Sequence, residues 1–173
     1  MTLALGVYHY GLSYHLATEK LRADPAPDRR FPDAPIEFLA VHAVELYLKA
    51  MLMAEGDNED ELRDRYGHNL LKMAYQVASK SDGIGPDVIS AVNFLWMNRR
   101  NIESRYLRAG AHKVLPSSHL CGLLRSLCIT THNRMFEIGA KPRPLPEFNE
   151  LFGYLASRPQ SPENSDDSGA GTN

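Results

Sequence analysis

Cysteine is scarce in this chain, and long uncharged apolar runs are missing. Only two cysteines occur among 173 residues, Cys121 and Cys128. On one helix they lie roughly 10 Å apart, too far for a disulfide, so we expect reduced core thiols. The most apolar stretch is broken by His42, Glu45 and Lys49, so no membrane span is expected. The start lacks a basic region followed by an apolar run, so no signal peptide is expected and a cytoplasmic location is predicted.

A strong excess of charge is also missing. Nineteen Lys and Arg stand against 21 Asp and Glu, which gives a net charge of −2. Affinity for nucleic acid or for an anionic membrane surface would therefore have to come from a local patch. The chain has no glycine-rich phosphate loop, nucleophile elbow or paired-carboxylate signature. We expect no cofactor.

The apolar spacing predicts helices and no strands. With 43% hydrophobic residues the chain can build one core. We predict an all-α, up-and-down bundle of about five helices in residues 1–140. A Pro-rich connector and a short packing helix follow in 141–156, and 157–173 are predicted to be a disordered polar tail. The expected helices run from Leu3 to about Leu21, from near Pro35 to Gly56, from near His68 to about Ser79, from Pro86 to about Ala109, and from Pro116 to about Ile138.

Helical periodicity predicts which faces pack. The second helix is apolar almost all round, so we expect it at the centre, with Glu45 and Lys49 paired one turn apart. An acidic turn is expected at 56–61, and Ser117 and Ser118 after Pro116 are expected to cap the fifth helix. The apolar stripe of the first helix consists of Leu3, Val7, Tyr10, Tyr14, Ala17 and Leu21.

The fourth expected helix carries a local basic patch. Between residues 99 and 113 there are five basic residues and one acid, Glu103, so this segment is +4 in a chain of −2. Arginine and amide side chains on one helix face can contact phosphate oxygens and base edges. The alternative is a solvated basic face with an Arg99–Glu103 pair. Arg99 falls in the apolar stripe, where it must be paired, reach solvent or face another subunit. The residues concerned are Asn98, Arg99, Arg100, Asn101, Arg105, Arg108 and Lys113.

His42, His68 and His132 can each be interpreted in structural or in chemical terms. His68 lies at a helix start, where it or Asn69 caps the helix, or where the imidazole acts in catalysis. His42 on the central helix is either a satisfied core histidine or a base. Cys128 and His132 lie one turn apart, but metal sites need closer ligand pairs, so no metal site is predicted.

Three segments together resemble the HEPN superfamily of helical domains. They are Ala43-Val-Glu-Leu-Tyr-Leu-Lys-Ala50, Gly67-His-Asn-Leu-Leu-Lys72 and Arg100-Asn-Ile-x-x-Arg-Tyr106. The similarity covers about residues 1 to 140. Members of this superfamily that cut RNA use an Arg followed by a His a few residues further on. Two such motifs meet across a dimer and cleave without metal, with the Arg on the phosphate and the His in proton transfer.

This sequence departs from that motif. Arg100-Asn101 matches its start, but Arg105 stands where the His is expected, and a guanidinium that stays protonated cannot act as a base. A second register joins Arg105 to His112 with six intervening residues, although Gly110 should break the helix between them.

The resemblance therefore implies three alternatives. The leading one is a HEPN-like homodimer, formed through the fourth-helix region, that binds RNA or a nucleotide with little or no catalysis, in a defence or toxin–antitoxin setting. The second is a metal-independent endoribonuclease with Arg105 and His112 as catalytic residues. The third is a structural module whose basic face docks an acidic protein partner. The leading hypothesis assigns phosphate contacts to Arg99, Arg100, Asn101, Arg105 and Arg108.

Overall fold

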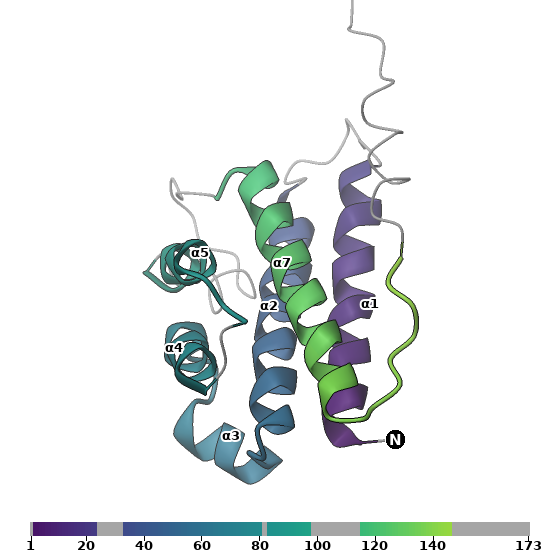
Figure 1. Cartoon of the computed structure of the whole chain (residues 1–173). Coiled ribbons are helices and arrows are strands. Elements are labelled where there is room, and N and C mark those ends of the chain that lie inside the picture. The colour runs from purple at the N-terminus through teal and green to yellow at the C-terminus, as the bar shows by residue number, and fades with distance from the viewer. Residues whose placement is uncertain (1, 24–32, 81–82, 98–114, 147–173) are drawn as a thin grey trace, which may run out of the picture.

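The computed structural model of the chain is all-helical over the residues that it describes (Figure 1). This confirms the prediction of an all-α helical bundle. The described residues are 2–23, 33–80, 83–97 and 115–146. Their helices are α1 (Leu3–Ala23), α2 (Asp33–Ala54), α3 (Glu59–Arg65), α4 (Leu70–Lys80), α5 (Pro86–Met97) and α7 (Ser117–Glu137). The predicted short helix in 147–156 and the tail 157–173 lie outside them.

Helix α2 is the centre of the bundle, as its all-round apolar pattern predicts. The long helices α1, α2 and α7 run along a common direction, while α4 and α5 are seen end-on beside them (Figure 1). Helix α2 contacts α1, α7, α4 and α3. An ion pair of 2.6 Å between Arg134 of α7 and Glu55, just after α2, links the ends of these two helices. The fully buried side chains that form the core include Val44, Tyr47, Leu48, Met51, Leu52, Leu70, Met73, Leu124, Leu127 and Met135.

Helix α1 buries a different face from the one that its apolar stripe predicts. Leu3 and Tyr10 of that stripe are 55% and 68% exposed, so this prediction is wrong for both residues. The buried face instead contains several polar residues, which a hydrophobic pattern cannot identify as core positions. Its members are Ala4, Leu5, Tyr8, Gly11, Leu12, His15, Thr18 and Glu19.

The buried polar side chains of α1 have partners on α2 and within α1. His15 Nδ1 lies 3.1 Å from the Tyr47 hydroxyl of α2. Glu19 pairs with Arg22 at 3.4 Å, and Arg22 also donates to Cys121 Sγ of α7. Because a buried polar group without a partner is destabilising, these contacts favour one register of α1 against its neighbours.

The acidic segment that was expected to be a turn is helical in part. Asn58 caps α3, because its side chain accepts the Glu61 N–H while the Glu61 carboxylate accepts the Asn58 N–H. This reciprocal capping box, with three acids in the first turn, stabilises a short helix. Gly67, at φ +54°, then separates α3 from α4.

Helix α7 begins and ends close to the predicted residues, but the expected side-chain cap at its start is missing. Its N-cap is Pro116, which makes no side-chain capping bond, so the predicted serine cap is wrong. Gly139, at φ +74°, ends the helix, and residues 141–146 continue without regular secondary structure, as the KPRPLP sequence predicts. None of the described helices is long and apolar enough to cross a membrane.

Candidate functional site

The predicted phosphate-binding residues belong to the segment between α5 and α7, outside the described residues. Helix α5 ends at Met97, and the described chain resumes at Leu115, just before α7. These two helices contact each other. The described residues that flank the basic segment therefore belong to neighbouring helices. Arg99, Arg100, Asn101, Arg105, Arg108 and His112 lie outside the described residues.

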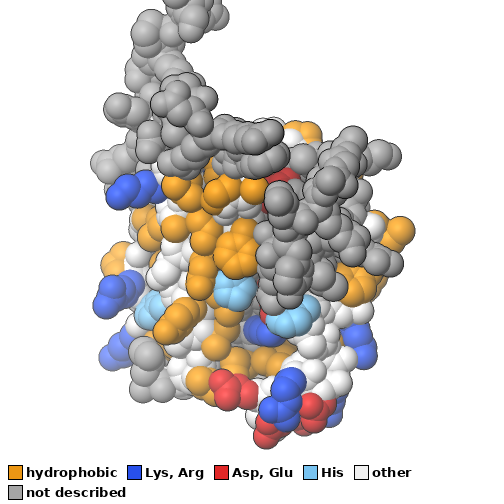
Figure 2. Space-filling view, turned by 180° about the vertical axis from the view of Figure 1, so that it is seen from behind, with side chains coloured by type: hydrophobic (Ala, Val, Ile, Leu, Met, Phe, Trp, Pro, Cys, Tyr) orange, Lys and Arg blue, Asp and Glu red, His pale blue; other side chains and the backbone are white. Residues whose placement is uncertain are grey.

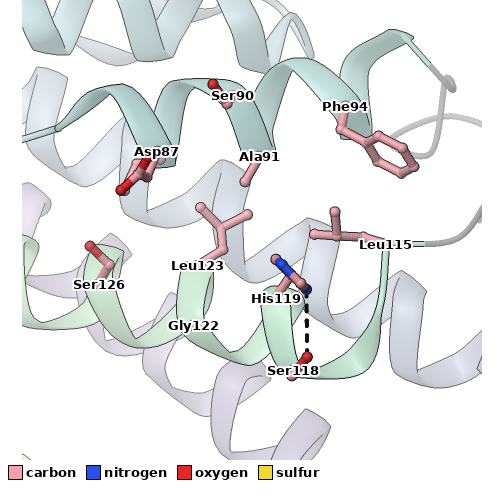
Figure 3. A pocket seen from close by; sticks show the side chains of 11 residues that line it. Asp87, Ser90, Ala91, Phe94, Leu115, Ser118, His119, Gly122, Leu123 and Ser126 are labelled. Atoms are coloured by element: carbon pink, nitrogen blue, oxygen red, sulfur yellow. Dashed lines mark hydrogen bonds between the residues drawn. The ribbon is translucent and has the colours of Figure 1, made fainter.

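An open groove of about 840 Å³ lies between α5 and α7 (Figure 3). Ala91 and Leu123 face each other in the middle, and Phe94 lies at the end near Leu115. Its size is within the range of small-ligand sites. The groove is mostly apolar, however, and Asp87 is the only Asp, Glu, Lys or Arg among its described lining residues, so it is a poor phosphate site by itself. Its remaining lining residues are Val88, Ser90, Ser118, His119, Gly122 and Ser126.

A second group of polar side chains joins α2 to the start of α4. One carboxylate oxygen of Glu45, Oε1, lies 2.7 Å from Lys49 Nζ and 2.9 Å from His68 Nδ1. The predicted Glu45–Lys49 pair is thereby confirmed. We call these three residues the Glu45 cluster.

The side chains of the Glu45 cluster become more exposed in the order Glu45, Lys49, His68. The Glu45 side chain is 3% exposed, that of Lys49 is 23% exposed, and that of His68 is 53% exposed. Burial by itself would raise the pKa of Glu45, but the hydrogen bonds and charges of Lys49, and then of His68, hold that pKa below its ordinary value. An ionised carboxylate therefore lies beneath a cation and an imidazole that reach the surface.

The turn before α4 sets the position of His68. The Gly67 N–H reaches the carbonyl oxygens of Leu62 and Arg63 at 3.1 Å, which closes the end of α3. Asn69 caps α4, because its Oδ1 accepts the Lys72 N–H at 2.9 Å. Of the two predicted caps, Asn69 is confirmed, while His68 points to Glu45 instead.

The contact between Glu45 and His68 is the feature that sequence reasoning missed. The two residues are 23 positions apart, in two segments that no single periodicity connects. A signal was present, because both belong to segments that carry the resemblance. His42 is half-buried in the same helix, with its ring stacked on Phe38 and edge-on to Tyr14, as expected of a histidine with a packing role. In the view of Figure 2, histidines lie among hydrophobic side chains, and acidic side chains gather at the lower end.

Cys128 and His132, which lie one turn apart on α7, both contact Tyr8 of α1. The Tyr8 hydroxyl lies 2.9 Å from His132 Nδ1 and 4.0 Å from Cys128 Sγ. Both cysteines are free and buried, as predicted. Within the described ranges, no group of three or more His, Cys, Asp and Glu side chains is arranged to hold a metal ion.

Comparisons of the chain with protein-family models, with curated proteins and with solved structures gave no match.

Proposed function

We propose that this chain is a HEPN-like module that dimerises and binds RNA or a nucleotide through its phosphate groups. The observation that carries the proposal is the charge of the segment 99–113, which is +4 in a chain of −2. Guanidinium groups bind phosphate oxygens through paired N–H donors, and amides add contacts to base edges. The contacts come from Arg99, Arg100, Asn101, Arg105 and Arg108.

Two features of the described residues support this proposal. The basic segment is flanked in the sequence by two helices, α5 and α7, that contact each other. The Glu45 cluster supplies a further cation, Lys49, which is paired with the more deeply buried carboxylate of Glu45. The helical bundle itself is of the class that the resemblance implies.

The dimer forms through the region around the end of α5. Met97, the last residue of α5, is 71% exposed, and the apolar groove between α5 and α7 opens beside this helix. Arg99 follows in the apolar stripe, a position that suits a guanidinium facing a second subunit. Sedimentation of the full chain at several concentrations tests the dimer, with the variant Met97→Glu as comparison. The dimer is expected to weaken in the variant, and a monomeric wild type would refute it.

Catalysis is weak or absent, because Arg105 occupies the motif position where a titratable base is needed. The test is incubation of the purified chain with total RNA in EDTA, next to a His112→Ala variant. Unchanged RNA is the expected result. Cleavage that disappears in the variant would replace this assignment with a ribonuclease that uses Arg105 and His112.

Binding is tested directly with a fluorescently labelled single-stranded RNA. Wild type is expected to raise the anisotropy saturably, and the double variant Arg100→Ala/Arg105→Ala is expected to bind at least about tenfold more weakly, since each charge-assisted contact contributes of order 1.5–3 kcal/mol. Equal binding by both proteins would refute the proposed contacts.

A further inference from the structure

The Glu45 cluster has an arrangement of charge that suits a bound anion. Its negative group is buried, and its cationic or titratable groups lie outside it, with both Lys49 Nζ and His68 Nδ1 on the same Glu45 oxygen. An ammonium has three N–H donors, and Glu45 takes one from Lys49. An approaching anion therefore meets Lys49 and His68 before it meets the carboxylate.

The N-terminal end of helix α4 adds to the attraction of the Glu45 cluster for an anion. His68 directly precedes Asn69, the residue that caps α4, so the imidazole lies at the N-terminal end of a helix of 11 residues. The backbone N–H groups of a first helical turn and the helix dipole both favour negative charge at that end. The Glu45 cluster brings a second element, α2, to the same place.

The other charged groups described near the Glu45 cluster are those of the first turn of α4 and of the α3 region. Lys72 adds positive charge, with its ammonium 2.8 Å from the Arg65 carbonyl oxygen and 5.6 Å from the Tyr66 ring centre. Most acids of the neighbouring α3 region pair with other cations, namely Asp57, Asp60, Glu61 and Asp64 with Arg63, Arg65 or Lys80. Arg65 lies 3.3 Å from Glu61, and Lys80 lies 3.2 Å from Asp57.

We infer that Lys49, His68 and the first turn of α4 form a binding site for an oxyanion, namely a phosphate group of the bound ligand. Glu45 is the positioning residue of this site, because it holds both side chains from below. The inference deepens the proposed function and rests on it for the identity of the ligand. It adds phosphate contacts from α2 and α4 to those assigned to the basic segment.

The test uses the full chain and inorganic phosphate as the probe. Histidine ring signals are followed by ¹H–¹⁵N NMR during a phosphate titration at constant pH and ionic strength. The His68 ring signals are expected to move saturably, while those of the exposed His119 in the α5–α7 groove stay in place. Removing one charge-assisted donor in Lys49→Met is expected to weaken phosphate binding about tenfold.

Two comparisons keep the test decisive. Lys49→Arg retains the cation above Glu45 and is expected to bind phosphate within about threefold of wild type, since a charge-assisted donor is retained. This controls for a Lys49→Met variant that loses its fold, which the backbone amide spectrum would show. His68 signals that do not move, or phosphate binding by a folded Lys49→Met equal to that of wild type, would overturn the inference.

Labelled RNA separates this inference from the proposed function. If RNA binding falls in Arg100→Ala/Arg105→Ala but is unchanged in Lys49→Met and in His68→Gln, the proposed function stands and the inference is overturned. If wild type binds no RNA while phosphate still moves the His68 signals in a Lys49-dependent way, the site stands and its ligand is a different phosphate compound.

Discussion

The Tyr8 hydroxyl lies 2.9 Å from Nδ1 of His132, and this contact joins α1 to α7 inside the bundle. Tyr8 is fully buried, and His132 is nearly so. Burial first, and then the neighbouring Cys128, raises the pKa of Tyr8 far above its ordinary value, so the phenol stays protonated. The pair therefore forms a neutral hydrogen bond between α1 and α7. The two residues are 124 positions apart in sequence.

Removing that hydroxyl should destabilise the protein. Tyr8→Phe keeps the ring but leaves His132 Nδ1 without this partner, and an unsatisfied buried polar group costs about 1–3 kcal/mol. Urea unfolding monitored by circular dichroism gives the free energy of unfolding. Tyr10→Phe is the matched control, because Tyr10 is 68% exposed and removal of its hydroxyl should change stability by less than about 0.5 kcal/mol. Equal destabilisation of the two variants would contradict a buried link at Tyr8.

The stability of the fold should decrease in mild acid. Burial first, and then the charge of His9, lowers the pKa of His132 below 6.5 in the folded state. Below pH 6.5 the unfolded chain thus binds a proton that the folded chain binds only at lower pH, so stability is present above that pH and falls below it. The melting temperature, measured between about pH 7.5 and 5.5, should decline less in His132→Asn than in wild type. His119→Asn, which alters an exposed histidine, should retain the wild-type slope.

Two glycines should respond in opposite directions to alanine. A Cβ at Gly11 would lie 3.1 Å from the Tyr47 ring and 3.3 Å from Leu46 Cβ, so α1 and α2 would have to separate. Overpacking of this kind typically costs about 1–3 kcal/mol. A Cβ at Gly122 of α7 would meet nothing within 4 Å, so Gly122→Ala should stabilise the helix by about 0.5–1 kcal/mol. Thermal unfolding of both variants tests the close approach of α1 and α2 at Gly11. A Gly11→Ala protein as stable as wild type would contradict it.

Neither cysteine should react in the folded protein. Burial first, and then Glu19, raises the pKa of Cys121 to about 12, and burial also raises that of Cys128. The thiolate is the reactive form, so alkylation at pH 8 should be slow in buffer and fast in urea. Mass spectrometry after a short pulse of iodoacetamide measures both rates. Rapid labelling of either residue in buffer would contradict its burial.

The features that could be predicted are those whose signal lies within the sequence of a single helix. The all-round apolar pattern of α2 indicated a central position, and the Glu45–Lys49 pair followed from its one-turn spacing. The capping box of α3 was present in the sequence as Asn58 and Glu61, but the segment 56–61 was predicted to be a turn. Both types of signal are local, and local signals are what a single sequence shows most clearly.

The packing of α1 and the Glu45 cluster required the structure. His15 and Glu19 look like surface residues, and only their partners on α2 and within α1 make their burial favourable. Leu3 and Tyr10 look like core residues but lie on the outer face. The Glu45–His68 contact joins α2 to the start of α4, and no periodicity within one segment can predict a contact between two of them.

The salt dependence of RNA binding tests the central claim most directly. Removing one phosphate-binding side chain should reduce the slope of log Kd against log salt concentration by about 0.7 for a single strand. Arg100→Ala/Arg105→Ala should therefore lower the slope by about 1.4 and weaken binding. The control Arg63→Ala/Arg65→Ala removes the same charge from the acid-paired surface of α3 and should retain the wild-type slope. Equal slopes in all three proteins, or no RNA binding by wild type, would contradict a phosphate-binding function.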